Sequence, residues 1–146
     1  MLVTFSCETG DTEKLALSAA VGAVQARAAI RLRRIPDAEN SATSEAAIRM
    51  RKEYVGPAEA DILGADALIL AASADTTVRS APWQNFLSLL LRLSSEGRLG
   101  RKVGASIGGL SSALAGLGFV TVTDLSSDPQ ALGRSVADMA RSLKSS

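Results

Sequence analysis

A turn of small and hydroxyl-bearing residues, Thr9-Gly10-Asp11-Thr12, joins an apolar run to a stretch with helical periodicity. The first amides of a helix have no partner within the helix, and the helix dipole is positive there, so such a turn can bind phosphate. The hydroxyls of Ser6, Thr9 and Thr12 would add hydrogen-bond donors. The same residue types also act as helix N-caps and turn formers. The turn alone therefore leaves both phosphate binding and simple capping open.

A second candidate motif is Gly104-Ala105-Ser106-Ile107-Gly108, which matches the G-x-S-x-G pattern of serine hydrolases. The sequence contains no histidine, so no imidazole can activate Ser106. A cysteine phosphatase would use Cys7 together with an arginine at position 13, but that residue is Glu13. One cysteine without any histidine also cannot form a zinc or iron–sulfur ligand set. We therefore expect neither a hydrolytic nucleophile nor a metal site.

The composition indicates one globular domain spanning residues 1–146. Basic and acidic side chains nearly cancel, giving a formal net charge of +1, so no overall field attracts nucleic acid or an anionic membrane. We find neither a membrane-spanning apolar window nor a signal peptide in the sequence. A single cysteine fits a reducing compartment. We expect a cytoplasmic protein whose partners are small molecules or other proteins.

Short apolar runs alternate with helical patterns along the chain. We predict strands at residues 2–5, 28–35, 67–72, 102–106 and 119–123, and helices at residues 12–26, 45–53, 81–93, 110–117 and 129–144. Repeated strand–helix units predict a parallel α/β sheet with helices on both faces. Ligands of such sheets bind beyond the carboxyl ends of the strands. The loops after the first, third and fourth strands are therefore the ones to examine.

The arginines around the second strand and the single tryptophan both have a structural interpretation. The cluster of Arg27, Arg31, Arg33 and Arg34 is interpreted as a solvated edge that resists aggregation, with contact to an anionic partner or to the 2′-phosphate of NADPH as the alternative. Trp83 and Phe86 lie one helical turn apart, and we expect them to pack in the core rather than to stack on a ligand.

The residues around the Thr-Gly-Asp-Thr turn resemble the FMN phosphate-binding signature of flavodoxins, an aromatic residue followed by small residues and T-G-N-T-E-x-x-A. The matching segment here reads Phe5-Ser6-Cys7-Glu8-Thr9-Gly10-Asp11-Thr12-Glu13-Lys14-Leu15-Ala16. The resemblance continues to the final helix, and the spacing after the third strand is also similar to the NAD(P)H:quinone oxidoreductase branch of the flavodoxin-like superfamily. It implies an α/β flavodoxin-like three-layer sandwich with a five-stranded parallel sheet in the order 2-1-3-4-5.

The resemblance also implies that FMN is held by the loops after the first, third and fourth strands. Carried over by motif position, its phosphate would contact Ser6, Thr9, Gly10, Asp11 and Thr12. The flavin ring would lie between Ser73, Ala74, Asp75 and Thr76 on one side and Ser106, Gly108 and Gly109 on the other. No catalytic side chain is implied, because the flavin carries out the redox chemistry.

The chain departs from the flavodoxin signature in ways that leave two hypotheses open. Asp11 replaces the usual asparagine and places a carboxylate near the phosphate, and Ala74-Asp75-Thr76 contains no aromatic residue to stack on the flavin. The first hypothesis is an FMN-binding redox protein, either an electron carrier with a redox partner protein or a small FMN-dependent oxidoreductase that uses NAD(P)H to reduce quinones or flavins. The second is a flavodoxin-fold module that has lost FMN and binds other molecules. In either case, the leucine-rich stretch at residues 87–93 suggests a homodimer.

Overall fold

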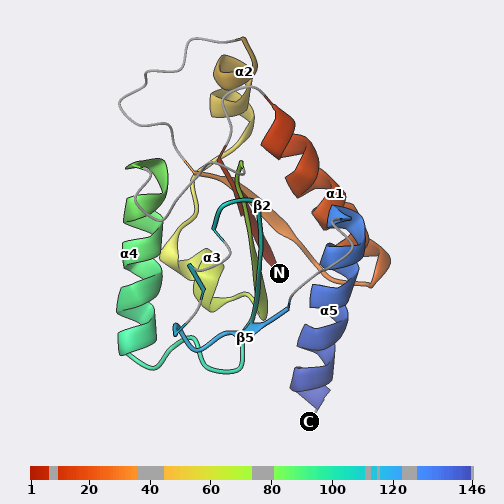
Figure 1. The fold of residues 1–146 in the computed structure, drawn as a ribbon, viewed down its shortest axis with the longest axis vertical. Coiled ribbons are helices and arrows are strands. Elements are labelled where there is room, and N and C mark those ends of the chain that lie inside the picture. Colours follow the sequence, from red (N-terminus) through yellow and green to blue (C-terminus); the bar gives the residue numbers. More distant parts are fainter. Residues whose placement is uncertain are drawn as a thin grey trace.

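The computed structural model describes residues 1–6, 10–35, 45–73, 81–110, 113–114, 116–122 and 128–145. In chain order the elements are β1 (Leu2–Phe5), α1 (Asp11–Gln25), β2 (Arg31–Arg34), α2 (Glu45–Glu53), α3 (Glu59–Leu63), β3 (Ala67–Ala71), α4 (Ala81–Ser95), β4 (Val103–Ile107), β5 (Val120–Thr121) and α5 (Pro129–Ser145). The strands form one parallel five-stranded sheet in the order β2-β1-β3-β4-β5 (Figure 1). This is the order that the sequence resemblance implies.

Two segments differ from the elements predicted from the sequence. The helix predicted at residues 110–117 is wrong, because the described residues of this stretch form turns, in which Gly116 has a left-handed backbone. The short helix α3 is not indicated by the sequence pattern, since it follows Gly56-Pro57, a pair typical of a turn. β2 also begins at Arg31 rather than at residue 28. The other elements lie within a few residues of their predicted positions.

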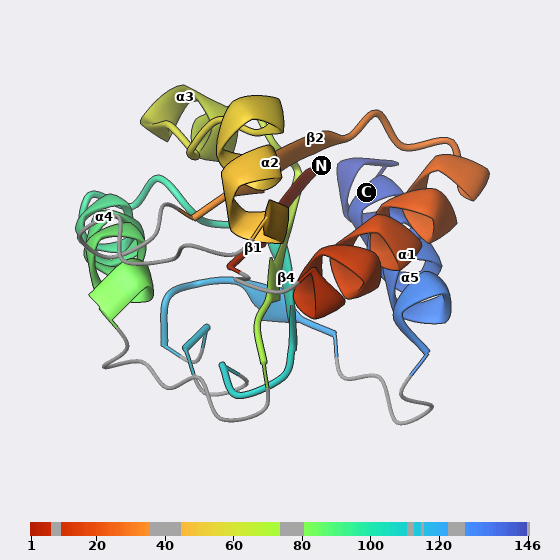
Figure 2. The ribbon, with the colours of Figure 1, turned by 90° about the horizontal axis from the view of Figure 1, so that it is seen from above.

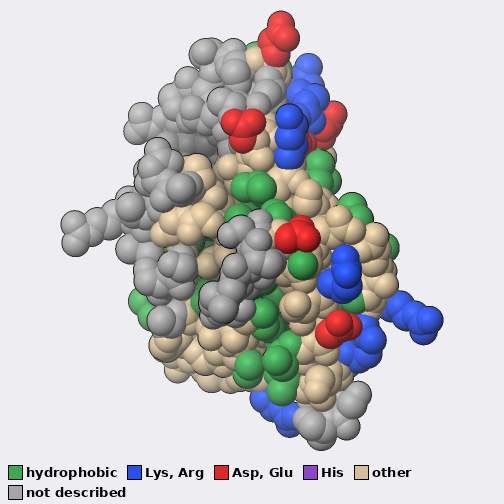
Figure 3. Space-filling view, turned by 45° about the vertical axis from the view of Figure 1, so that its right-hand side comes forward, with side chains coloured by type: hydrophobic (Ala, Val, Ile, Leu, Met, Phe, Trp, Pro, Cys, Tyr) green, Lys and Arg blue, Asp and Glu red, His purple; other side chains and the backbone are tan. Residues whose placement is uncertain are grey.

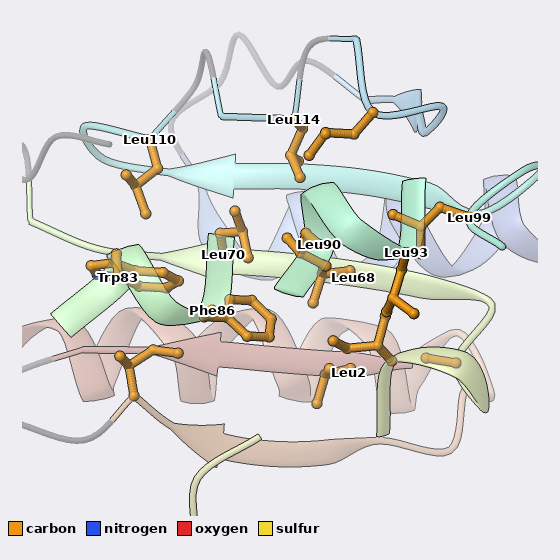
Figure 4. Packing of buried hydrophobic residues seen from close by; sticks show 14 of the residues in the cluster. Leu2, Leu68, Leu70, Trp83, Phe86, Leu90, Leu93, Leu99, Leu110 and Leu114 are labelled. Carbon is orange, nitrogen blue, oxygen red and sulfur yellow. The ribbon is translucent and has the colours of Figure 1, made fainter. Parts of the chain in front are cut away.

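Helices cover both faces of the sheet and give the molecule three layers (Figure 2). Because side chains alternate along a strand, Leu68 and Leu70 of β3 point to the face covered by α4, where they pack with Trp83 and Phe86 (Figure 4). Ile69, between them, packs on the opposite face against residues of α1 and α5. No helix in the described ranges is both long and apolar enough to cross a membrane.

Glycines let α1 and α5 pack backbone against backbone. A Cβ atom at Gly22 would lie 1.9 Å from the carbonyl oxygen of Gln130, and one at Gly133 would lie 1.9 Å from the carbonyl oxygen of Ala19. Such distances leave no room for a side chain at either position. The buried side chains at this contact are correspondingly small, including Ala23. The alanine-rich sequence of α1 is therefore explained by its close approach to α5.

The arginines of β2 fasten α3 to the edge of the sheet. Arg31 and Arg33 both bind the carboxylate of Asp61, at 3.0 and 3.2 Å. The same carboxylate accepts a hydrogen bond from the backbone amide of Ala58 at 2.9 Å and so caps α3. β2 is an edge strand as interpreted, but Arg34 is buried. The interpretation of these arginines as a solvated edge is therefore wrong for Arg34, and the other two are held by Asp61.

Candidate functional site

The carboxyl ends of β1, β3 and β4 lie side by side, because Phe5 pairs in register with Ala71 and Ala71 with Ile107. Backbone hydrogen bonds continue this pairing beyond the strands. The amide of Ser6 donates to the carbonyl of Ala71 at 3.3 Å, and the amide of Ala72 donates to the carbonyl of Ile107 at 2.9 Å. The structure therefore brings together the described first residues of the three loops in which the sequence predicts the candidate site.

Gly108 holds the start of the loop after β4 against the end of β3. Its φ is +92°, and a Cβ atom there would lie 1.9 Å from the carbonyl oxygen of Ala72. The amide of Gly109 donates to the carbonyl of Ser73 at 3.0 Å. Ser106 is half-buried within β4 itself and not on the sharp strand-to-helix turn of a hydrolase nucleophile. Three of the residues expected beside a flavin ring contact one another: Ser73, Gly108 and Gly109. Ser106 lies within β4. The other three, Ala74, Asp75 and Thr76, lie outside the described residues.

The N-terminus of α1 coincides with the Thr-Gly-Asp-Thr turn. Gly10 is the N-cap residue of α1 and has a left-handed φ of 96°. Glycine has no side chain, so the N-cap residue itself makes no side-chain capping hydrogen bond to the first turn. Thr12 is buried, whereas Asp11 is exposed. Thr9 lies outside the described residues.

The carboxylate of Glu13, in the first turn of α1, is bound by residues of and beside α2. Arg49 approaches it at 2.6 Å and 3.2 Å through its two terminal nitrogens, and the Tyr54 hydroxyl donates to it at 2.6 Å. The Tyr54 ring packs edge-on against Phe5, with centroids 5.0 Å apart, and Arg49 also binds Glu53 at 2.6 Å. The negative charge of Glu13 is thus compensated, and α2 is held beside the start of α1 (Figure 1).

These contacts shift the pKa values of Glu13 and Tyr54. Hydrogen bonds from Arg49 and then Tyr54 hold the pKa of Glu13 below its ordinary value of 4.5, although burial opposes them. Burial, followed by the hydrogen bond to Glu13, raises the pKa of Tyr54 to about 12. A carboxyl with a depressed folded-state pKa contributes stability that is fully present above its unfolded pKa. That contribution is lost as the pH falls through the folded-state value.

We expect Glu13→Gln to lower the free energy of unfolding by about 1–2 kcal/mol at neutral pH, because an ionised acceptor is lost from Arg49 and Tyr54. The difference from wild type should shrink below about pH 4, as the wild-type carboxyl becomes protonated. Urea unfolding at a series of pH values measures both effects. Glu45→Gln, at an exposed position in the first turn of α2, is the control. A difference that stays constant over the whole pH range would contradict the assignment.

Trp83 has the core position predicted for it and one further contact. It is fully buried near the start of α4, and its ring lies edge-on to Phe86 with centroids 6.1 Å apart. Its indole Nε1 also donates a hydrogen bond to the Ser6 hydroxyl oxygen at 2.6 Å. The two residues are 77 positions apart, so no local spacing indicates this pair. The strand order and the place of α4 are both needed to bring them together.

A cavity of about 360 Å³ lies at the opposite, amino edge of the sheet, and its lining includes Arg141, Lys144 and Asp66. Arg141 donates to the carbonyl of Ala26, just after the end of α1, and Lys144 pairs with Asp66 at 3.1 Å. Cations at helix C-termini stabilise the negative end of the helix dipole. The basic residues here therefore have a structural explanation, and we assign this cavity no ligand.

The strand order, the helices on both faces and the loops that meet at the carboxyl edge define a flavodoxin-like fold. No protein-family model matches the sequence, and no curated protein matches it significantly. Among solved structures, a WrbA-like flavodoxin from Agrobacterium tumefaciens is 18% identical with a TM-score of 0.60, covering 97% of this chain and 96% of that chain. A short-chain flavodoxin associated with a non-canonical PDU bacterial microcompartment is 16% identical with a TM-score of 0.62, and the match covers 97% of this chain and 95% of that chain. The flavodoxin of Megasphaera elsdenii is 15% identical with a TM-score of 0.61, and the match covers 94% of this chain and 99% of that chain. Identities this low establish the fold, whereas function depends on the residues of the site.

Proposed function

We propose that this chain binds FMN at the carboxyl edge of its sheet and acts as a redox protein, either an electron carrier or a small NAD(P)H-dependent quinone or flavin reductase. The observation that carries the proposal is the N-terminus of α1, where Gly10 forms a left-handed N-cap without a capping side chain. The sequence resemblance places the FMN phosphate at this turn. Among the structural neighbours, the Megasphaera elsdenii flavodoxin was determined in its two-electron reduced form. That neighbour, which shares this fold, is therefore redox-active.

The described residues fit a phosphate group at this turn. Ser6 and Thr12, which precede and follow Gly10 in the chain, both carry hydroxyl groups, and the charge of Glu13 in the same turn is compensated by Arg49. Bound FMN would supply electron transfer. The protein itself would hold the phosphate at the start of α1 and would bind the flavin ring where the loops after β3 and β4 meet.

Two observations favour the second candidate, a flavodoxin-fold module without FMN that binds other proteins. Asp11 is exposed in the first turn of α1, and a carboxylate close to a phosphate repels it. α1 also exposes three apolar residues at helical spacing, Leu17, Val21 and Val24, with exposed fractions of 41%, 49% and 53%. Hydrophobic side chains are visible among the charged ones on the α1 and α5 side of the molecule (Figure 3). Exposed apolar surface of this kind is typical of protein contacts.

The absorption spectrum of the purified protein, followed by titration with FMN, separates the two functions. We expect flavin bands or saturable quenching of flavin fluorescence. Thr12→Ala should weaken FMN binding about tenfold to a hundredfold, because it removes a hydroxyl donor to a charged phosphate. Thr121→Ala, at an exposed position on β5, is the matched control and should leave the affinity unchanged. Absence of bound flavin and of quenching at high FMN concentration would contradict the redox proposal and favour the module.

A further inference from the structure

The hydrogen bond between Trp83 and Ser6 joins the start of the loop after β1 to the helix that follows β3. Ser6 is the first residue after β1, and Trp83 lies in the first turn of α4, the helix that follows β3. The indole Nε1 and the serine oxygen are 2.6 Å apart, and the indole is fully buried. The ring is also held on its apolar side by core residues that include Leu70 and Phe86 (Figure 4). The donor is therefore fixed in direction.

The direction of this bond determines what the Ser6 hydroxyl can do. A serine hydroxyl has one hydrogen to donate and can also accept, whereas an indole N–H donates only. Because the Ser6 oxygen accepts from Trp83, the hydrogen of Ser6 is directed away from the indole and is available for donation to another group. A hydroxyl that accepts one hydrogen bond is also polarised toward a stronger donation of its own. The bond from Trp83 thus favours the orientation in which Ser6 donates, which is the orientation that recognition of a phosphate oxygen requires.

The backbone of Ser6 is fixed as well as its side chain. Its amide donates to the carbonyl of Ala71, at the end of β3, at 3.3 Å. Ser6 is therefore held by the end of β3 through its backbone and by α4 through its hydroxyl. A binding group held in place before the ligand arrives loses less conformational freedom on binding.

We propose that Trp83 is a positioning residue for phosphate recognition: by orienting the Ser6 hydroxyl as a donor, it makes the site select phosphorylated FMN over unphosphorylated riboflavin. This inference rests on the proposed FMN binding and adds to it a residue that does not touch the phosphate. Trp83 acts through Ser6, so its effect appears in the ratio of the two affinities and not in flavin binding as such.

The bond itself can be tested without any ligand. The chain has one tryptophan, so its ¹H–¹⁵N spectrum contains one indole signal. We expect the exchange of this buried N–H with solvent to be slow in the wild type and at least about tenfold faster in Ser6→Ala, which leaves the indole without its acceptor. Equal exchange in both proteins would overturn the proposal.

The selectivity is tested by titrating FMN and riboflavin into the wild type, Ser6→Ala and Trp83→Phe while following flavin fluorescence. We expect each variant to lower the FMN-to-riboflavin affinity ratio about tenfold, equivalent to about 1.4 kcal/mol. The double variant should lose no more than either single variant, because both remove one linked contact. Phe86→Leu, which alters the same core without a polar contact, should change both affinities alike and leave the ratio at the wild-type value.

The outcomes distinguish failure of the inference from failure of the proposed function. If the wild type binds neither FMN nor riboflavin, both are overturned. If it binds FMN but the ratio is unchanged in Ser6→Ala and Trp83→Phe, the inference fails and the proposed function stands. If Trp83→Phe does not fold, Ser6→Ala replaces it in the titration, because it removes the acceptor of the same bond from a small, half-buried side chain.

Discussion

Gly133→Ala is expected to destabilise the protein by about 3 kcal/mol, although alanine ordinarily favours a helix interior over glycine by up to about 1 kcal/mol. The added methyl group would lie 1.9 Å from the carbonyl oxygen of Ala19 in the middle of α1. A helix backbone cannot yield locally in the way that the end of a flexible side chain can. The two helices must therefore separate and open contacts that are buried in the native protein, which costs more than the helix propensity gains.

Urea unfolding and thermal melting of Gly133→Ala measure this effect, with an expected fall in Tm of roughly 6–12 °C. Gly22→Ala should behave alike, since its methyl group would meet the Gln130 carbonyl oxygen at 1.9 Å. Gly100→Ala is the control, because no atom lies within 4 Å of its added methyl group. We expect the control to stay within about 0.5 kcal/mol of wild type. A neutral or stabilising Gly133→Ala would show that α1 and α5 are not in backbone contact.

Much of the fold can be predicted from the sequence because its signals are local. The continuous apolar run of β3 predicts a central strand, and all its residues are buried. Asp128 before Pro129 predicts the start of α5, and the Asp128 carboxylate indeed accepts from the amide of Gln130 at 3.1 Å. Each of these features depends on neighbouring residues alone. The order of the strands, in contrast, follows from the family resemblance and not from any local pattern.

The error at residues 110–117 has a physical reason. The sequence predicts a short helix of small residues at 110–117, within which Leu110, Leu114 and Leu117 lie at helical spacing. All three are buried, but turns present them to the core instead. Gly116 and Gly118, both with left-handed φ, permit this tight path. Three leucines at helical spacing are thus all buried although the described residues around them form turns and no helix.

The sequence predicts which strand and helix ends flank the candidate site, but it does not predict which side chains meet there. The Thr-Gly-Asp-Thr motif correctly indicates a turn between β1 and α1, because the motif and the two elements are adjacent in the chain. The sequence presents Glu13 as a charge that would repel an anion, and its partner Arg49 is 36 residues away. Ser6 and Trp83 are still farther apart. Residue types show which groups can bond, but only the fold shows which of them meet.

Gly108→Ala is expected to destabilise the protein by about 3 kcal/mol and to act directly on the candidate site. About 1 kcal/mol or more of this comes from an alanine held at a φ of +92°. The rest comes from overpacking, since the methyl group would lie 1.9 Å from the Ala72 carbonyl oxygen and 3.0 Å from that of Ser73. Relief requires the loop after β4 to move away from the end of β3.

Gly116→Ala separates the two causes, because Gly116 has a φ of +78° but no atom within 4 Å of an added methyl group. It should show the conformational strain alone, about 1 kcal/mol, in urea unfolding. Only Gly108→Ala should also speed hydrogen exchange at the amides of Ala72 and Gly109, which bond to the Ile107 and Ser73 carbonyls at 2.9 and 3.0 Å. Equal loss of stability in both variants, with both amides still protected, would mean that the two loops are not packed together. A flavin ring would then lack the place proposed for it, since that place exists only where the loops after β3 and β4 meet.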